Sequence, residues 1–135
     1  MNKTQKIQRV IDTLPLYKKE KGTLGTRYGN GECHACVMGV IALMYLEESG
    51  DSETVFWVPD LEKDKLVVRF THKNGKEMLS YSDSRVSDNI VDFSGLSKTE
   101  LGQLRNANDN PRSSANWEQE LKLLKFFRDQ PLDPT

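Results

Sequence analysis

Cysteine, histidine and net charge are all scarce in this chain, which has two cysteines, two histidines and a formal charge of −1 over 135 residues. A near-zero net charge argues against general nucleic-acid binding, which needs an excess of lysine and arginine. Cys33 and Cys36 are three positions apart, a spacing that rarely reaches disulfide geometry on one helix. We therefore expect free thiols and a cytoplasmic protein.

Long apolar runs and nucleotide-binding glycine motifs are also missing. The most apolar window, residues 37–46, is far too short for a membrane span, and the first apolar run is broken by charges, unlike a signal peptide. The glycines at positions 25, 29 and 31 are not followed by the Lys-Ser/Thr pair of a phosphate-binding loop. We expect no membrane partner and no bound cofactor.

Charge is distributed unevenly along the chain. Residues 1–27 contain seven lysines or arginines and two carboxylates, a balance of +5, so the remainder carries −6. A basic arm on an acidic body could steer an anionic partner toward the protein. A solvated helix face followed by a lysine-rich loop is the simpler interpretation and the favoured one.

Helical spacing of apolar residues predicts two helices in the first third of the chain. The pattern over residues 2–14 indicates a helix that ends at Pro15. Residues 16–25 are too polar for a core element and predict an ordered loop or a short strand. Residues 33–47 are apolar nearly all round, so we expect a central helix buried by the rest of the fold.

The pattern changes in the middle of the chain. Residues 54–58, 66–71 and 77–81 are rich in β-branched and aromatic side chains. Asn74-Gly75 lies between the last two runs and is a strong hairpin signal. Three antiparallel strands are predicted here.

Helices are predicted again after residue 84. A short one covers 84–93, a second begins at a capping box formed by Ser97 and Glu100 and ends near residue 106, and a third covers about 115–129. The sequence therefore predicts one α+β domain over residues 1–135. In it, N- and C-terminal helices pack around a buried central helix and a small antiparallel sheet of about three strands.

The densest group of reactive side chains follows a glycine-rich turn. Cys33 is expected at a helix N-terminus, where the helix dipole stabilises a thiolate. His72, at the end of a predicted strand, could serve as the base, and the order Cys–His is that of papain-like cysteine amidases and proteases. One hypothesis is thus a cysteine hydrolase with Cys33 as nucleophile.

Other interpretations of the same turn remain open. Backbone N–H groups at a turn that leads into a helix suit an anion or another small ligand, with Gly29, Asn30, Gly31 and His34 as the binding residues. The four cysteines and histidines have the side chains that zinc prefers, but their spacing is poor for it, so no metal is expected. The favoured interpretation is structural, because Cys36 has the helical spacing of a core residue.

A second polar cluster occupies residues 105–114. Its asparagine, aspartate and serine side chains are typical of turn and cap hydrogen bonds between helices, and Asn116 is a plausible cap for the last helix. A polar binding loop is the functional alternative. Asn108 and Asp109 are its candidate residues.

The chain resembles a family of small domains found in bacteriophage and prophage genomes. Residues 17–24 look like its Tyr-Lys-Gln-Gly-Lys-Gly-x-Leu stretch, and residues 36–41 are similar to its Cys-Cys-Leu-Gly-Val-Leu helix start, with Val37 in place of the second cysteine. Residues 95–97 and 108–109 resemble later motifs, in the family's order. The family has no assigned catalytic residues, so the resemblance transfers none.

The resemblance implies a phage-related protein acting in the cytoplasm of a bacterial host. Together with the absence of a clear catalytic set, it favours a non-enzymatic accessory protein that binds a host or defence component. The Cys33–His72 hydrolase and the small-ligand binder are the alternatives.

Overall fold

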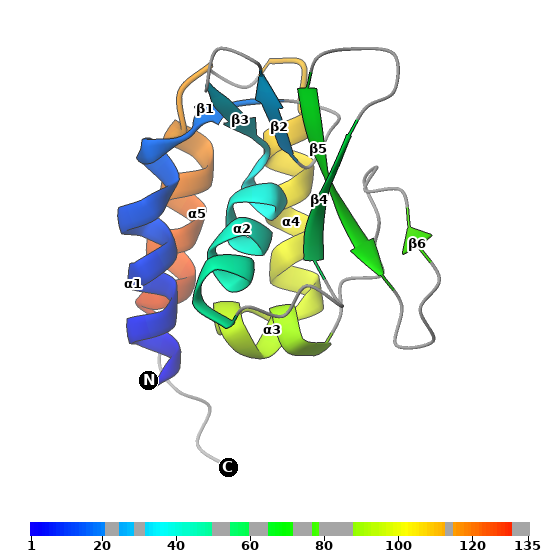
Figure 1. The fold of residues 1–135 in the computed structure, drawn as a ribbon. Helices are drawn as coiled ribbons and strands as arrows, with labels where there is room; N and C mark the ends of the chain where they lie inside the picture. The colour runs from blue at the N-terminus through cyan, green and yellow to red at the C-terminus, as the bar shows by residue number, and fades with distance from the viewer. Residues whose placement is uncertain are drawn as a thin grey trace.

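The computed structural model has an α+β fold, as predicted, and describes residues 1–20, 25–28, 32–49, 55–59, 65–71, 77–78, 88–112 and 115–130 (Figure 1). The elements are α1 (Lys3–Thr13), η1 (Leu14–Leu16, a short 3-10 turn), β1 (Lys18–Lys19), β2 (Gly25–Tyr28), β3 (Cys33–Ala35), α2 (Val37–Ser49), β4 (Val55–Pro59), β5 (Lys65–Thr71), β6 (Glu77–Met78), α3 (Asp88–Ser94), α4 (Lys98–Asp109) and α5 (Glu118–Arg128).

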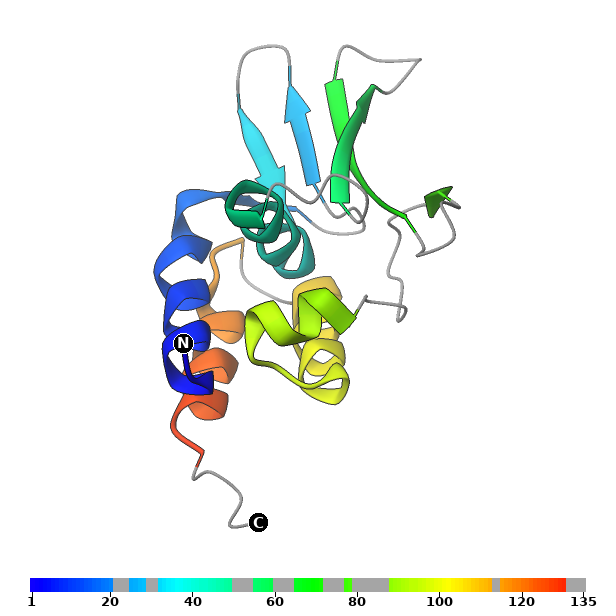
Figure 2. The same cartoon turned by 60° about the horizontal axis from the view of Figure 1, so that its bottom comes forward.

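Helix α2 lies at the centre of the molecule, between the sheet on one side and the remaining helices on the other (Figure 2). Every residue from Val37 to Met44 is buried, which confirms the predicted central helix. α1 and α5 pack side by side along one flank, and α3 and α4 pack against α2 from below in Figure 2. The core is therefore a helical layer closed by a sheet.

The sheet has more strands than the three that the sequence predicted. The strand order is β1-β3-β2-β5-β4, and β6 pairs with β5. β4, β5 and β6 are the three predicted strands and pair in antiparallel fashion, while the Asn74-Gly75 turn lies outside the described residues. β1, β2 and β3 come from the N-terminal part of the chain and extend this sheet, because β2 pairs with β5 and β3 pairs with β2. β1 runs parallel to β3.

The predicted start of the central helix is wrong. Residues 33–35 form strand β3, and α2 begins at Val37. The physical reason is pairing on both sides: Cys33 faces Arg27 of β2, and His34 and Ala35 pair with Lys18 and Lys19 of β1. These long-range backbone hydrogen bonds override an apolar pattern that continues into the helix.

Local sequence signals set several helix ends. Ser97 and Glu100 form the predicted capping box at α4, which extends to Asp109 rather than ending near 106. Gly95 precedes it with a φ of 74°, a left-handed conformation that favours glycine. The predicted N-cap at Asn116 is wrong, because Trp117 is the N-cap residue of α5, and the Trp117 side chain makes no capping hydrogen bond.

Candidate functional site

Cys33 lies in a strand rather than at a helix N-terminus. Its side chain is partly buried, and its backbone pairs with Arg27. The helix-dipole argument for a reactive thiolate at Cys33 therefore fails. The glycine turn does not lead directly into a helix either, because β3 separates it from α2. The free N–H groups of the helix start are therefore not next to this turn.

Cys36 is the residue that precedes the first turn of α2. Its sulfur accepts a hydrogen bond from the Gly39 N–H at 3.4 Å, and its carbonyl accepts one from Val40. Burial raises the pKa of the Cys36 thiol to about 12, an effect larger than the stabilisation by nearby backbone N–H groups. Cys36 is thus a buried core thiol, as its spacing predicted.

His72, Gly29, Asn30 and Gly31 lie outside the described residues. The pairing of Cys33 with His72 therefore stays a prediction, and so does ligand binding by the glycine turn. Within the described residues, no three histidine, cysteine, aspartate or glutamate side chains are arranged to hold a metal ion.

Asn108 joins three parts of the fold from a fully buried position on α4. Its Oδ1 accepts a hydrogen bond from the Val37 N–H at 3.1 Å, and its Nδ2 donates to the Glu20 carbonyl oxygen at 3.0 Å. It also donates to the exposed carboxylate of Asp109 at 3.3 Å. Asn108 therefore caps α2 and fastens the end of β1 to α4.

His34, which pairs with Lys18 of β1, lines a pocket of about 540 Å³. One wall comes from the segment 15–19 around η1 and β1, and the other from residues 115–121 at the start of α5. Tyr17, Trp117 and Leu121 supply apolar surface. The charged and basic groups of the lining are Lys18, Lys19 and His34, together with the carboxylate of Glu118. Ligand pockets of this size commonly combine apolar walls with a few polar groups.

Buried bonds hold the two walls of this pocket together. The Trp117 indole N–H donates to the Tyr17 carbonyl oxygen at 3.0 Å. Two positions along, Lys19 Nζ lies 2.9 Å from Glu120 Oε1, and both side chains are at most 1% exposed. Lys19 Nζ also lies 5.9 Å from the centre of the Trp117 ring. The walls are therefore pre-formed by contacts between residues about 100 positions apart.

Two basic residues of the pocket, Lys18 and His34, share one carboxylate, whereas Lys19 pairs with Glu120. Glu32 Oε1 lies 2.9 Å from Lys18 Nζ, and Glu32 Oε2 lies 3.1 Å from His34 Nε2. The hydrogen bond from Lys18, followed by that with His34, lowers the pKa of Glu32. The Tyr28 ring meets the His34 ring edge-on, with their centres 4.9 Å apart. His34 is thus held between an aromatic ring and a carboxylate.

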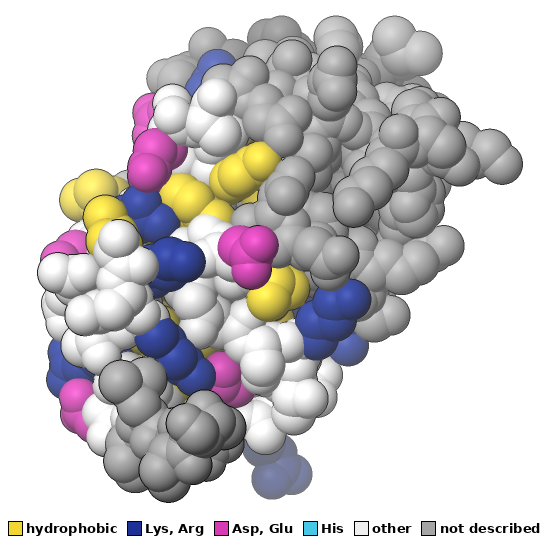
Figure 3. All heavy atoms as spheres, turned by 90° about the horizontal axis from the view of Figure 1, so that it is seen from below, with side chains coloured by type: hydrophobic (Ala, Val, Ile, Leu, Met, Phe, Trp, Pro, Cys, Tyr) yellow, Lys and Arg dark blue, Asp and Glu magenta, His cyan; other side chains and the backbone are white. Residues whose placement is uncertain are grey.

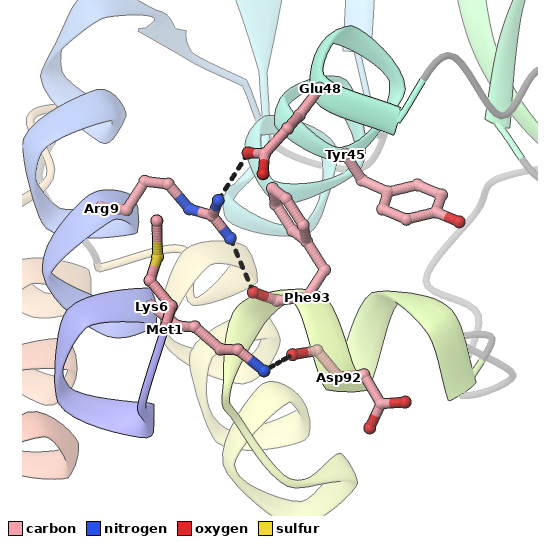
Figure 4. A pocket seen from close by; sticks show the side chains of 7 residues that line it. All are labelled: Met1, Lys6, Arg9, Tyr45, Glu48, Asp92 and Phe93. Atoms are coloured by element: carbon pink, nitrogen blue, oxygen red, sulfur yellow. Dashed lines mark hydrogen bonds and ion pairs between the residues drawn. The ribbon is translucent and has the colours of Figure 1, made fainter.

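A second pocket, of about 430 Å³, lies between α1, α2 and α3 (Figure 4). The Arg9 guanidinium lies over the Phe93 ring, 3.9 Å from its centre, and donates to Glu48 and to the Phe93 carbonyl oxygen. Lys6 donates to the Asp92 carbonyl oxygen at 2.6 Å. Both cations therefore bind carbonyl groups at the C-terminal end of α3, a structural task.

The basic N-terminal segment is largely neutralised within the molecule. Among the described residues of this segment, Lys3 pairs with Glu100, Arg9 with Glu48, Lys18 with Glu32 and Lys19 with Glu120. Figure 3 accordingly shows lysine and arginine side chains close to acidic and hydrophobic ones on the underside of the molecule. This pairing favours the solvated-face interpretation over a free basic arm.

Sequence analysis missed Trp117 and Glu120 as site residues. A signal was present, because Glu120 lies three positions after Trp117 and four before Leu124 on the apolar face of α5. A glutamate on an apolar helix face indicates a buried charge, which requires a cationic partner. The identity of that partner, Lys19, could not be read from the sequence.

Within the described parts of the chain, no helix combines the length and the apolar character needed to cross a membrane. Comparisons with models of protein families, with curated proteins and with solved structures found no match to this chain.

Proposed function

We propose that this chain is a non-enzymatic accessory protein that binds a protein partner through the pocket between Tyr17 and Trp117. The observation that carries the proposal is the construction of this pocket. Its walls are joined by a buried ion pair and by the Trp117–Tyr17 hydrogen bond, while its rim carries exposed polar groups. A pre-formed pocket loses little conformational entropy when it is occupied.

The composition of the pocket also favours recognition of a protein. Aromatic anchors inside a polar rim are typical of the centre of a protein interface. Catalysis by a cysteine has less support than protein binding, because the pKa of Cys36 is raised to about 12 and Cys33 lies in a strand. The sequence resemblance gives the proposed context: a phage or prophage protein in a bacterial cytoplasm, acting on a host or defence component.

Site-specific photo-crosslinking tests this function. A photoreactive amino acid is placed at Leu121, which lines the pocket, and in a matched variant at Lys122, which is exposed on the same helix and does not line it. Each variant is irradiated in bacterial lysate, and each adduct is identified by mass spectrometry. The identified protein is then purified and tested for direct binding.

The expected result is one adduct specific to position 121 and direct binding of that protein to the unmodified chain. Substitution of Trp117 by alanine is then expected to weaken binding by tenfold or more, provided that circular dichroism shows a folded variant. Identical adducts at positions 121 and 122, or an adduct whose purified protein does not bind, would overturn the proposal.

A further inference from the structure

Glu32 binds two residues of the pocket, Lys18 and His34, without lining the pocket itself. Its two carboxylate oxygens are divided between Lys18 and His34, and both of these residues line the cavity. The side chains of Glu32, Lys18 and His34 are 44%, 64% and 25% exposed. Because exposed ion pairs contribute little to folding, the Glu32 carboxylate can leave this position at low cost.

Comparison with the second pocket, called here the Arg9 pocket, shows why the contacts of Lys18 and His34 point to a ligand. There the cations also bind backbone carbonyl groups at the end of α3, so their positions serve the fold. Lys18 and His34 instead meet at a carboxylate supplied by a neighbouring exposed side chain. Their geometry already suits two oxygens of one carboxylate, at 2.9 and 3.1 Å.

Beside Lys18 and His34 lies a surface suited to an apolar group. Tyr17 and Trp117 present aromatic walls, and Leu121 adds an aliphatic side chain. On this side the Lys19 ammonium group already binds Glu120 Oε1, and the Trp117 N–H already donates to the Tyr17 carbonyl oxygen. A ligand with a hydrophobic body and one carboxylate therefore matches both halves of the pocket.

We infer that the pocket binds a carboxylate attached to a hydrophobic group, as found at the C-terminus of a protein whose last residue is aromatic or branched. The ligand carboxylate replaces that of Glu32 on Lys18 and His34, and the last side chain enters between Tyr17 and Trp117. Capture of chain ends is an established mode of peptide recognition. This inference rests on the proposed function, because it names the feature of the partner that the pocket recognises.

The test is isothermal titration of the purified chain with four probes. They are a glycine–serine hexapeptide ending in phenylalanine with a free carboxylate, the same peptide as its C-terminal amide, the same peptide ending in serine, and 3-phenylpropionate. The free-acid phenylalanine peptide is expected to bind at least tenfold more tightly than the amide and the serine peptide. Equal affinity of the amide would overturn the inference.

Two substitutions test the roles of Glu32 and Lys18 in ligand binding. Glu32→Gln removes the competing charge and is expected to strengthen binding several-fold, whereas Lys18→Met is expected to weaken it several-fold. Glu48→Gln, which alters the equivalent carboxylate in the Arg9 pocket, is the matched control and should leave affinity unchanged. Equal effects of Glu32→Gln and Glu48→Gln would contradict the inference.

The remaining probe distinguishes the source of the carboxylate. Weaker binding of 3-phenylpropionate than of the peptide supports a protein chain end, and equal or tighter binding overturns that source. If crosslinking at position 121 identifies a partner but the free-acid peptide binds no better than its amide, the proposed function stands and this inference fails.

Discussion

Asn108 accepts a hydrogen bond from the Val37 N–H at 3.1 Å, so a side chain of α4 caps the N-terminus of the buried helix α2. Few helices in small domains start in the core, because their first N–H groups need partners. Here the amide side chain satisfies one of these groups and also binds the Glu20 carbonyl oxygen.

Asn108→Ala is expected to destabilise the protein by about 2–4 kcal/mol, because it leaves the buried Val37 N–H and the partly buried Glu20 carbonyl group without their partner. Urea unfolding followed by circular dichroism measures the change. Asn110→Ala is the control: Asn110 is exposed, and its side-chain oxygen accepts a hydrogen bond from the Arg112 N–H two positions away. Equal losses in the two variants would contradict the capping role.

The buried pair of Lys19 and Glu120 gives a second prediction. Lys19→Met is expected to cost about 3–5 kcal/mol, because it leaves the Glu120 charge buried without its cation. Adding Glu120→Leu to Lys19→Met should recover most of the lost stability, since no uncompensated charge remains. Urea unfolding of both single variants and the double variant measures this coupling.

The exposed ion pair of Lys18 and Glu32 is the control for the buried pair of Lys19 and Glu120. Lys18→Met should change stability far less than Lys19→Met, since the Lys18 side chain is 64% exposed. Additive effects of Lys19→Met and Glu120→Leu would show that the two side chains do not interact.

Gly95, just before α4, and Gly102, within α4, should respond in opposite directions to substitution by alanine. Gly95 has a φ of 74°, and a Cβ there would lie 3.1 Å from Lys6 Cβ and 3.3 Å from the Lys3 carbonyl oxygen. We expect Gly95→Ala to cost about 1–3 kcal/mol through backbone strain and crowding against α1.

Gly102 is the matched control, because it lies within α4 and a Cβ there meets nothing within 4 Å. Gly102→Ala should stabilise the protein by about 0.5–1 kcal/mol through its higher helix propensity. Thermal unfolding of both variants checks the pair of predictions. A loss of stability in Gly102→Ala would show that its surroundings are more crowded than described.

The buried thiol of Cys36 predicts a stability change at alkaline pH. Its pKa is raised from 9.0 to about 12, so between these pH values the unfolded chain has released a proton that the folded chain still holds. Stability must then fall as pH rises, by up to about 1.4 kcal/mol per pH unit. Unfolding from pH 8 to 10 should show a smaller decline in Cys36→Ala than in the unmodified protein.

Thiol labelling gives an independent check on the two cysteines. Cys33 is only partly buried, whereas Cys36 is 7% exposed and its pKa is raised. Iodoacetamide should therefore modify Cys33 in the folded protein while Cys36 reacts only after unfolding, as measured by peptide mass spectrometry. Labelling of Cys36 at the rate of Cys33 would contradict its place in the core.

The sequence predicted features that depend on neighbouring residues better than features that depend on distant ones. The capping box at Ser97 needs only residues 97–100, and the burial of α2 follows from its own apolar pattern. Strand β3 instead exists because residues 33–35 pair with two other segments. Such pairing overrides the local pattern, which predicted the start of a helix.

The candidate site was predictable only in part. His34 and Asn108 were both named, but the first lines the pocket while the second is a buried cap. The pocket walls depend on contacts of residues 17 and 19 with residues 117 and 120. Periodicity reports which face of one helix is buried, but it does not report which distant segment covers that face.

The packing of α1 against α5 has a consequence for synthesis on the ribosome. Gln8 and Arg128 are 120 positions apart, yet their side chains form a hydrogen bond of 2.7 Å. At about 5–20 residues per second, the ribosome needs roughly 6–24 s to add the intervening chain. During this interval α1, with its apolar residues Ile7 and Val10, lacks the helix that packs beside it, so this part of the core can close only after α5 has been made.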